Sequence, residues 1–392
     1  MINYSIAALV IVVDLLIIKE AFWERSVKEG LNWLAGRDKK PNSSSLGRTV
    51  TVLIPAYNEE STIKQTIESV KDQTREADRI LVVDDSSTDN TAEVARESGA
   101  EVITTPENAG TKSQAQDFAL SHLERDSIVV TIDADTVLDC EALERIVPHF
   151  YDNKTLASVC GFVIPQKVET FWERVRLIQY LYGISLNKSA QNHWKSPLVS
   201  SGCFSAFEVG KLKDMGGFPD NTMAEDMDLT WRYLQKGYDI KLEPAAVCYP
   251  LDPPTYKVYK AQVERWYRSF FQNISLHKRN FLKNKRLGLF VSTYLVLGLL
   301  TPAVIAFAGV TLAIQGPLSE FSLIFLAFFG ANFMLVNVIT LIKARSLNKL
   351  SVALKSLHCY WLEAPVEVYL FLKSFYLEWI KRDRLAKWEK GH

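Results

Sequence analysis

Three parts of the chain differ in how their apolar residues are spaced. Between residues 49 and 254, short runs of branched side chains alternate with amphipathic stretches that have the 3.6-residue period of a helix. Before and after this middle part, the apolar residues form longer runs. The pattern predicts an α/β domain that is flanked by apolar helices.

The middle part predicts strands and helices in alternation. Strands are expected at residues 50–54, 79–83, 101–104 and 128–132, with helices at 59–70, 90–98 and 112–123. Because strand and helix repeat in this order, we expect a doubly wound, Rossmann-like parallel sheet with helices on both faces. Further along, the pattern predicts a small-residue strand at 199–207 and helices at 170–188, 227–236 and 256–281.

Two uncharged runs, residues 287–314 and 321–342, dominate the C-terminal part. Each exceeds the roughly 20 apolar residues that cross a bilayer core, so we predict two transmembrane helices within residues 287–345. Two buried helices of a large soluble core are the alternative. The last part, residues 346–392, contains an apolar and aromatic stretch with acidic residues and Pro365. This mixture favours an interfacial or re-entrant element before a basic tail.

Residues 1–36 form a second apolar region. The run at residues 6–18 is interrupted only by Asp14 and lacks the flanks of a cleaved signal peptide. It predicts a membrane-spanning helix, with an interfacial helix as the alternative, and residues 23–34 predict a helix at the membrane surface. Residues 37–48 contain Lys, Ser and Pro and predict a linker.

Composition and charge indicate the kind of partner and how the chain is oriented in the membrane. The chain has 45 basic and 45 acidic side chains among its 392 residues, and this balance argues against a nucleic-acid partner. The five cysteines are scattered without metal-ligand spacing, which fits a reducing compartment. Basic residues cluster at 37–48, 278–286, 343–355 and 381–390. The positive-inside rule therefore predicts an integral protein of the cell membrane with a cytoplasmic middle domain and residues 315–320 outside.

Two pairs of acidic residues are the candidate catalytic and metal-binding residues. Asp133 and Asp135 directly follow the predicted strand at 128–132, and on an extended backbone both would point to one side and hold a hard divalent cation. A surface turn explains this Asp-x-Asp pair equally well when it is taken alone. Glu225 and Asp226 begin a predicted helix, where acids also stabilise the helix N-terminus. No glycine-rich phosphate loop of the dinucleotide or P-loop type occurs in the sequence, so a metal at Asp133 and Asp135 is the available means of neutralising a phosphate.

The order of the motifs carries more information than any one of them. The chain contains, in order, Pro55-Ala56-Tyr57-Asn58-Glu59, Val83-Asp84-Asp85-Ser86-Ser87-Thr88-Asp89, Asn108-x-Gly110-x-Lys112, Asp133-Ala134-Asp135, Glu225-Asp226 and Gln262-x-x-Arg265-Trp266. This set resembles the membrane-integrated family 2 glycosyltransferases, which include cellulose, chitin, hyaluronan and poly-N-acetylglucosamine synthases. Ser86, where the family often has glycine, and the charged Glu264 inside the last motif depart from the family pattern.

The resemblance implies a GT-A fold and an inverting transfer from a UDP-sugar, with a role for each motif. Asp84 and Asp85 would contact uracil and ribose, and Asp133 with Asp135 would hold Mg²⁺ or Mn²⁺ on the diphosphate. Asp226, beside Glu225, would be the general base. Gln262, Arg265 and Trp266 would close over the diphosphate and the acceptor, and the remaining donor-binding positions would be Pro55, Tyr57, Glu59 and Lys112.

Three functions remain open at this point. The first is a polymerising glycosyltransferase that extends a glycan at the membrane, and the second transfers one sugar to a lipid such as a polyprenyl phosphate, ceramide or diacylglycerol. A catalytically silent membrane scaffold is the third. For all three, the expected organisation is membrane or interfacial helices (1–36), a linker (37–48), the GT-A domain (49–254), amphipathic interface helices (255–286), two transmembrane helices (287–345) and interfacial or re-entrant helices with a tail (346–392).

Overall fold

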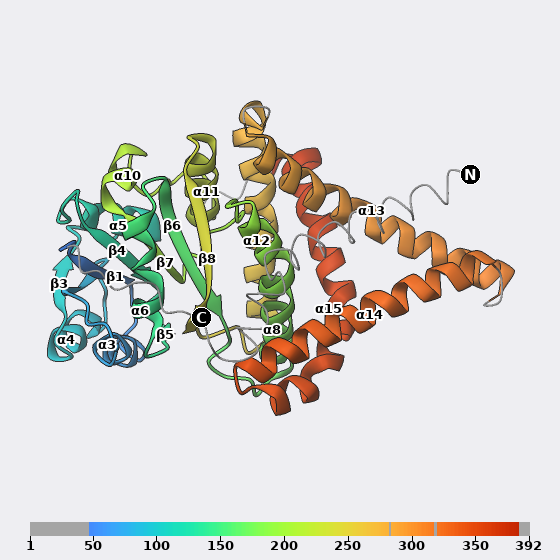
Figure 1. Ribbon diagram of the computed structural model, residues 1–392, viewed down its shortest axis with the longest axis horizontal. Helices are drawn as coiled ribbons and strands as arrows, with labels where there is room; N and C mark the ends of the chain where they lie inside the picture. The colour runs from blue at the N-terminus through green and yellow to red at the C-terminus, as the bar shows by residue number, and fades with distance from the viewer. Residues whose placement is uncertain (1–46, 282–283, 317–319, 384–392) are drawn as a thin grey trace.

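The computed structural model describes residues 47–281, 284–316 and 320–383 (Figure 1). The helices predicted within residues 1–36, nearly all of the linker at 37–48 and the basic tail beyond residue 383 lie outside the described residues. In the described part, an α/β domain is followed by a group of long helices, in the order that the apolar pattern predicts.

The α/β domain is built on one sheet of eight strands. In chain order these are β1 (Val50–Ala56), β2 (Arg79–Asp84), β3 (Glu101–Thr104), β4 (Ile128–Ile132), β5 (Val137–Leu138), β6 (Leu156–Val163), β7 (Phe204–Glu208) and β8 (Asp239–Tyr249). Their order in the sheet is β3-β2-β1-β4-β7-β6-β8-β5. Strands β3, β2, β1 and β4 are parallel, as predicted.

The prediction of a wholly parallel sheet is wrong for the second half. Strand β7 runs antiparallel to both of its neighbours, β4 and β6, and β5 runs antiparallel to β8, so the sheet is mixed. Every residue of β4 is buried. A strand that is covered on both faces is apolar throughout, whichever way its neighbour runs, so the sequence pattern of β4 does not reveal the direction of β7.

Helices cover both faces of the sheet, which confirms the layered arrangement. The helices of this part are α3 (Ile63–Lys71), α4 (Thr91–Glu97), α5 (Lys112–Leu120), α6 (Ala142–Ile146), α7 (His149–Asp152), α8 (Phe171–Gly183), α9 (Ser189–His193), α10 (Val209–Asp214) and α11 (Glu225–Gln235). Alternate residues of β1 point to opposite faces. Ile54 joins a core with α3, α4 and α6, whereas Leu53 joins a second core with α5, α10 and α11.

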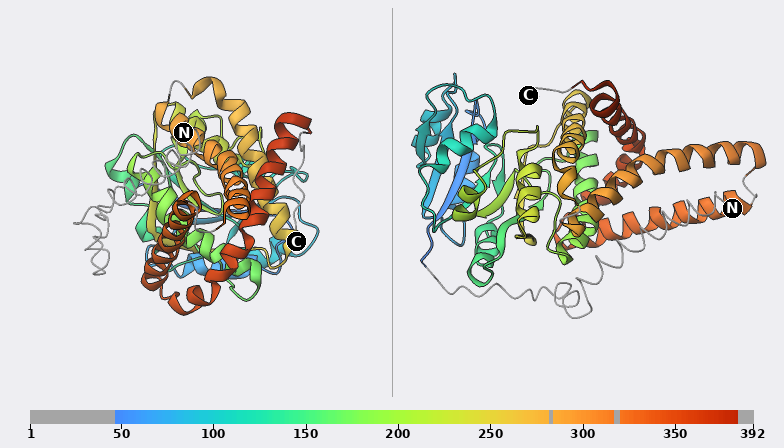
Figure 2. Two further views of the ribbon diagram at one scale, coloured as in Figure 1. Left: turned by 90° about the vertical axis from the view of Figure 1, so that its right-hand side faces the viewer. Right: turned by 90° about the horizontal axis from the view of Figure 1, so that it is seen from above.

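Four long helices form the C-terminal part. They are α12 (Tyr256–His277), α13 (Lys285–Gln315), α14 (Glu320–Ser346) and α15 (Leu350–Phe375), and α15 continues as the short π-helix η3 (Tyr376–Lys381). Helices α13 and α14 project away from the body as a hairpin, and α15 returns to pack on α8 and α12 (Figure 2). None of the helices within the described residues is both long enough and apolar enough to pass through a membrane.

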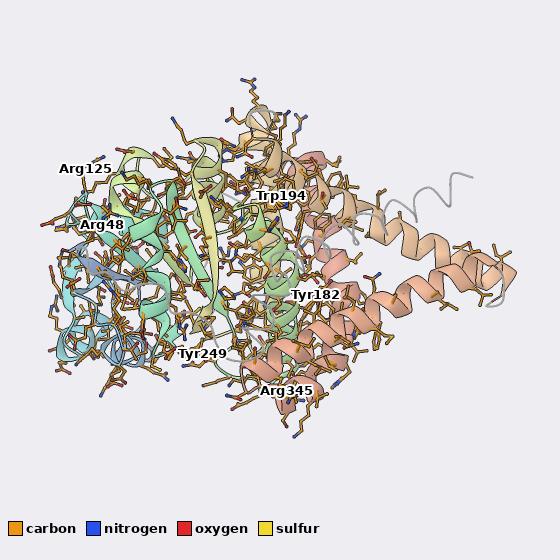
Figure 3. The ribbon with its side chains drawn as sticks, viewed as in Figure 1. Arg48, Arg125, Tyr182, Trp194, Tyr249 and Arg345 are labelled. Carbon is orange, nitrogen blue, oxygen red and sulfur yellow. The ribbon has the colours of Figure 1, made fainter. Side chains whose placement is uncertain are left out.

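Aromatic contacts of Trp194 and Tyr182, which are labelled in Figure 3, join the α/β domain to these helices. Trp194, which follows α9, packs edge-on against Phe290 of α13 with ring centroids 6.4 Å apart. Tyr182 of α8 lies 6.4 Å from Tyr360 of α15, measured in the same way. Helices α13 and α15 are therefore packed directly against the α/β domain.

Candidate active site

A cavity of about 1470 Å³ lies where the sheet meets the long helices. Loops at the carboxyl ends of β1, β2 and β4 form one side, and α8, α11 and α12 form others. The cavity is lined by nearly all of the predicted site residues, namely Pro55, Tyr57, Glu59, Asp85, Lys112, Asp133, Asp135, Glu225, Asp226, Gln262, Arg265 and Trp266. Segments that are far apart in the sequence are thus brought to one place.

Asp84, the last residue of β2, and Asp85, which follows it, have different surroundings. The carboxylate of Asp85 accepts hydrogen bonds from Thr105 Oγ1 (2.9 Å) and Ala109 N (2.8 Å), and it lines the cavity. Asp84 is not among the lining residues, and its Oδ1 accepts a hydrogen bond from Ser87 N (3.3 Å). In this structure Asp84 shapes the loop rather than facing the cavity.

The loop after β1 is tied to the loop after β2. Asn58 N donates to Ser87 Oγ (3.0 Å), and Thr88 N donates to Asn58 Oδ1 (2.8 Å). Glu59 anchors the start of α3, because its amide donates to Thr91 Oγ1 (2.7 Å) and its carboxylate accepts from Thr62 Oγ1 (2.8 Å). These hydrogen bonds fix the loop after β1 relative to the loop after β2.

Lys112 is the cation at the centre of the acids. Its ammonium donates to the Asp133 carboxylate and to Gly202 O (2.9 Å), and it lies 3.8 Å from Glu225 Oε1. Burial disfavours its charged form, but Asp133, Glu225 and Asp226 outweigh that effect and raise the pKa of Lys112. The lysine therefore remains charged and can attract a phosphate.

Asp133 and Asp135 lie in a turn, and not on the extended backbone that we expected. Thr136 N donates to Asp133 O (3.0 Å), which closes the turn directly after β4. Both residues nevertheless line the cavity. Among the described residues, no group of three or more acidic, histidine or cysteine side chains is arranged to hold a metal ion. Two carboxylate-bearing residues fit the Mg²⁺ sites that are completed by substrate phosphates and water.

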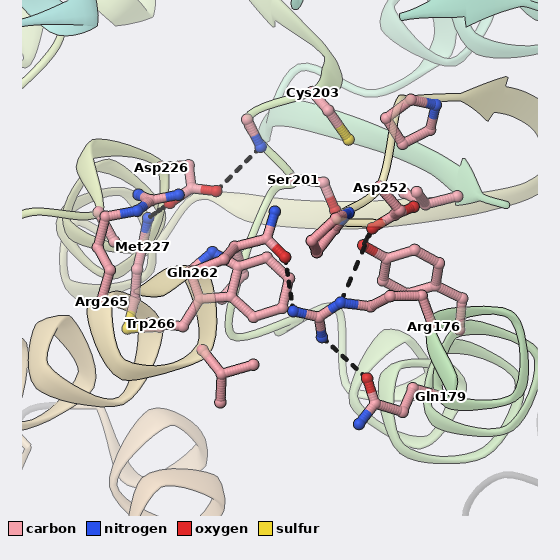
Figure 4. Close-up of a pocket in the computed structure, with 18 of the residues that line it drawn as sticks. Arg176, Gln179, Ser201, Cys203, Asp226, Met227, Asp252, Gln262, Arg265 and Trp266 are labelled. Atoms are coloured by element: carbon pink, nitrogen blue, oxygen red, sulfur yellow. Dashed lines mark hydrogen bonds and ion pairs between the residues drawn. The ribbon is translucent and has the colours of Figure 1, made fainter. Parts of the chain in front are cut away.

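Asp226 is fixed at the N-terminus of α11 (Figure 4). Its Oδ2 accepts a hydrogen bond from Gly202 N (2.9 Å), and its Oδ1 accepts one from Met227 N (2.8 Å). A Cβ at Gly202 would lie 3.2 Å from Asp226 Oδ2, so the small residue permits this close approach. Burial and the neighbouring Asp226 raise the pKa of Glu225, while Lys112 and Arg265 oppose the rise.

The last motif comes from α12 and reaches the same cavity. Arg265 Nη1 donates to Met223 O (3.0 Å), just before Glu225 and Asp226. Gln262 and Trp266 both contact Arg176 of α8, a residue that the sequence analysis missed (Figure 4). The available signal was a charged residue within the apolar run of α8, between Val175 and Leu177.

The inner end of the cavity is mostly apolar. It extends from the carboxylates to the space between α12, α13 and α15, where its lining includes Phe290, Tyr294, Leu297, Gly298, Pro302, Val368 and Phe371. The cavity thus joins a charged end to an apolar end.

Comparisons with known proteins bear on the family and the fold of this chain. Residues 51–215 match the model of glycosyl transferase family 2. Poly-beta-1,6-N-acetyl-D-glucosamine synthase of Staphylococcus aureus (strain COL) is 27% identical over 276 residues, which cover 69% of this chain and 65% of that relative. The Staphylococcus epidermidis synthase of the same name is 27% identical over 246 residues, or 62% of this chain and 59% of the relative. The matched region therefore spans less than two thirds of the length of these curated relatives.

A solved structure shows the fold. The mannosyltransferase PcManGT from Pyrobaculum calidifontis, in complex with GDP-Man and Mn²⁺, superposes with a TM-score of 0.55 at 20% identity. The likeness covers 90% of this chain and 98% of that one. The predicted GT-A-like α/β fold is thereby confirmed, with a mixed sheet.

Proposed function

We propose that this chain, which carries a family 2 glycosyltransferase domain at residues 51–215, transfers a sugar from a UDP-sugar to an acceptor hydroxyl with inversion at the anomeric carbon. The observation that carries the proposal is the convergence of Asp133, Asp135 and Asp226 on one cavity, together with Lys112. A catalytically silent scaffold has no need for this arrangement of charges.

The residues at the charged end have separate tasks in this proposal. Asp226 accepts the proton of the acceptor hydroxyl, because each of its oxygens keeps a lone pair beyond the backbone hydrogen bond that it accepts. Lys112 and Arg265 are the cations that face the departing diphosphate, where negative charge develops. Asp133 and Asp135 would hold Mg²⁺ or Mn²⁺, which would stabilise the same charge when bound. The Mn²⁺ in the PcManGT complex supports this choice of ion.

Two acceptors are compatible with the cavity. The name of the staphylococcal relatives supports the first, a growing glycan, with N-acetylglucosamine as the first sugar to test. Trp266 offers a flat apolar surface on which a pyranose ring can rest. The apolar inner end of the cavity favours the second, a membrane lipid, because an acyl or prenyl chain would be buried there against α13 and α15.

The membrane setting is part of the proposal. The hairpin of α13 and α14 exposes large apolar side chains, among them Val310, Ile314, Phe329, Phe333 and Met334. Such a patch on a projecting hairpin is expected to be covered by lipid. We place the GT-A domain on the cytoplasmic side of the cell membrane, where the positive-inside rule puts the basic segments.

One experiment separates the candidate functions. Membranes that contain the full-length protein are incubated with labelled UDP-sugars, starting with UDP-N-acetylglucosamine, and with GDP-mannose. A ladder or a high-mass product identifies the glycan acceptor, and a single product that extracts into organic solvent identifies the lipid acceptor. If no donor yields a labelled product in the presence of Mg²⁺ or Mn²⁺, the transferase proposal is wrong.

A further inference from the structure

We propose that Arg176 of α8 is a positioning residue that fixes the rotation of α12, and with it Gln262, Arg265 and Trp266, over the charged end of the cavity. The inference rests on the proposed function, because it assigns a role in sugar transfer to a residue outside the motifs. It is carried by contacts that Arg176 makes with one face of α12.

The guanidinium contacts three α12 residues that lie on one side of that helix. Its Cζ is 4.6 Å from the ring centroid of Tyr259 and 4.3 Å from that of Trp266. Its Nη2 donates to Gln262 Oε1 (2.5 Å). The spacing of these residues, i, i+3 and i+7, places all three on a single helical stripe, so one side chain of α8 contacts two turns of α12.

The remaining contacts of Arg176 hold its own side chain in place. Nη1 donates to Gln179 Oε1 (2.8 Å), and Nε lies 3.8 Å from Asp252 Oδ1, which also accepts a hydrogen bond from Tyr180 OH (3.0 Å). Arg176 and Asp252 are both buried, with 3% and 7% of their surface exposed. Both Nη atoms donate to glutamine side chains and both ring contacts are with α12, so most of the guanidinium is held by protein partners, which suits a positioning role.

The position of α12 matters because the same helix carries Arg265 and Trp266. Arg265 lies beside Met223 and opposes the rise in the pKa of Glu225, so a rotation of α12 would move its charge away from Glu225 and Asp226. Displacements of about 1 Å at a catalytic group reduce rates by about 100-fold. Loss of the Arg176 contacts is therefore expected to affect the reaction step more than donor binding.

The test compares Arg176→Lys and Arg176→Gln with Arg174→Gln, a matched control on the same helix that does not line the cavity. We expect kcat to fall by about 10- to 100-fold in both Arg176 variants, while the Kd for UDP, measured by calorimetry, rises by a smaller factor, because Arg265 faces the diphosphate but acts mainly on the charge that develops during the reaction. Lysine keeps the charge beside Asp252 but lacks the planar fork, so it should not rescue kcat. If either Arg176 variant has the kcat of the Arg174→Gln control, the inference is overturned.

A double-mutant cycle with Trp266→Phe shows whether Arg176 acts through α12. If it does, the combined loss in kcat/KM will be smaller than the product of the two single losses, because each change disturbs the same arrangement. Multiplicative losses would overturn the inference. If Arg176→Gln lowers the melting temperature, the cycle uses the double variant Arg176→Gln with Asp252→Asn in place of Arg176→Gln. This double variant removes both buried charges and so leaves neither of them without its partner.

The outcome for the wild-type protein separates this inference from the proposed function. Absence of sugar transfer from every donor would reject both. Transfer by the wild type, together with Arg176 variants that behave like the control, would reject the positioning role alone.

Discussion

Asp226 has the contacts that a general base requires, since backbone amides of Gly202 and Met227 orient its two oxygens without using all of their lone pairs. Asp226→Asn keeps the size of the side chain and one accepting oxygen but cannot take up a proton. We expect the rate of sugar transfer to fall by about 10² to 10⁴-fold, while UDP affinity measured by calorimetry is unchanged.

The matched control for that substitution is Asp214→Asn, which removes an exposed acid that pairs with Arg125. This variant should transfer sugar at the wild-type rate, because exposed ion pairs contribute little to stability. Wild-type turnover by Asp226→Asn would remove the general-base assignment and direct attention to Glu225.

Asp252 predicts a dependence of stability on pH. Burial, together with the nearby Glu173, raises the pKa of Asp252 to about 6, and Arg176 and Tyr180 oppose the rise. The folded protein therefore binds this proton more tightly than the unfolded chain, in which the pKa is about 4. The contribution to the free energy of unfolding is fully present below pH 4 and is lost as the pH rises to 6. The loss amounts to about 3 kcal/mol.

Asp252→Asn removes this titration, so the effect is measured as a difference between the variant and the wild type. Relative to the wild type, the variant should gain thermal stability as the pH is raised from 4 to 7, and little further above that. A constant difference in melting temperature across this range would show that Asp252 is ionised in the folded protein already at pH 4.

Some single positions were readable from the sequence and others were not. The acids were found because their order along the chain resembles a family. Ser86 has a φ of 56°, in the left-handed region that favours glycine, which accounts for the glycine that the family often has at this position. The serine has a contact that glycine could not make, because its Oγ donates to Thr105 O (2.8 Å). Glu264 is explained by Lys373 of α15, whose Nζ lies 2.8 Å away. Arg176 was missed because its partners on α12 are about 90 positions further along the chain.

At the scale of elements, some boundaries were predicted closely. Strand β4 has the residues expected from its apolar run, and α12 begins at Tyr256 as predicted. The direction of β7 could not be predicted, because pairing direction depends on where a distant segment enters the sheet. The segment from Asp133 to Asp135 was expected to be extended, but its backbone hydrogen bond to Thr136 makes it a turn.

Two of the three glycines of α13, Gly298 and Gly309, are expected to respond in opposite ways to substitution by alanine. An added Cβ at Gly298 would lie 2.3 Å from Phe371 Cζ, whereas none of the described atoms is within 4 Å of an added Cβ at Gly309. Gly298→Ala should lower the free energy of unfolding by about 1 to 3 kcal/mol, because α13 or the Phe371 ring must shift. Gly309→Ala should raise it by up to about 1 kcal/mol through helix propensity.

Thermal unfolding of the two alanine variants in detergent tests this contact between α13 and α15. Gly298→Ala should melt below the wild type and Gly309→Ala at or above it. Equal melting temperatures would mean that Phe371 does not pack against α13 in solution.

At the scale of the whole molecule, the cavity belongs to both parts of the chain. The GT-A domain supplies Lys112, Asp133 and Asp226, and the long helices supply Arg265, Trp266 and the apolar inner end. The match to the family model ends at residue 215, so it does not include α11 and α12, which carry the proposed base and the last motif. Neither part alone contains a complete site.

The hairpin of α13 and α14 gives the last prediction, which concerns where the molecule resides. Ile314 and Met334 have 78% and 67% of their surface exposed on this hairpin. Lysine at such positions costs little in water but roughly 2.5 to 3.5 kcal/mol in the middle of a bilayer, where Met334 would lie, and less at Ile314, which is next to the turn predicted at residues 315–320. If lipid covers the hairpin, Ile314→Lys with Met334→Lys should reduce the fraction of protein that stays with membranes after alkaline extraction.

The control places two lysines on exposed polar positions of the GT-A domain, Gln65→Lys with Ser121→Lys, and should fractionate like the wild type. If the hairpin variant also fractionates like the wild type, the exposed apolar side chains do not contact lipid, and the association with membranes must be sought elsewhere in the chain.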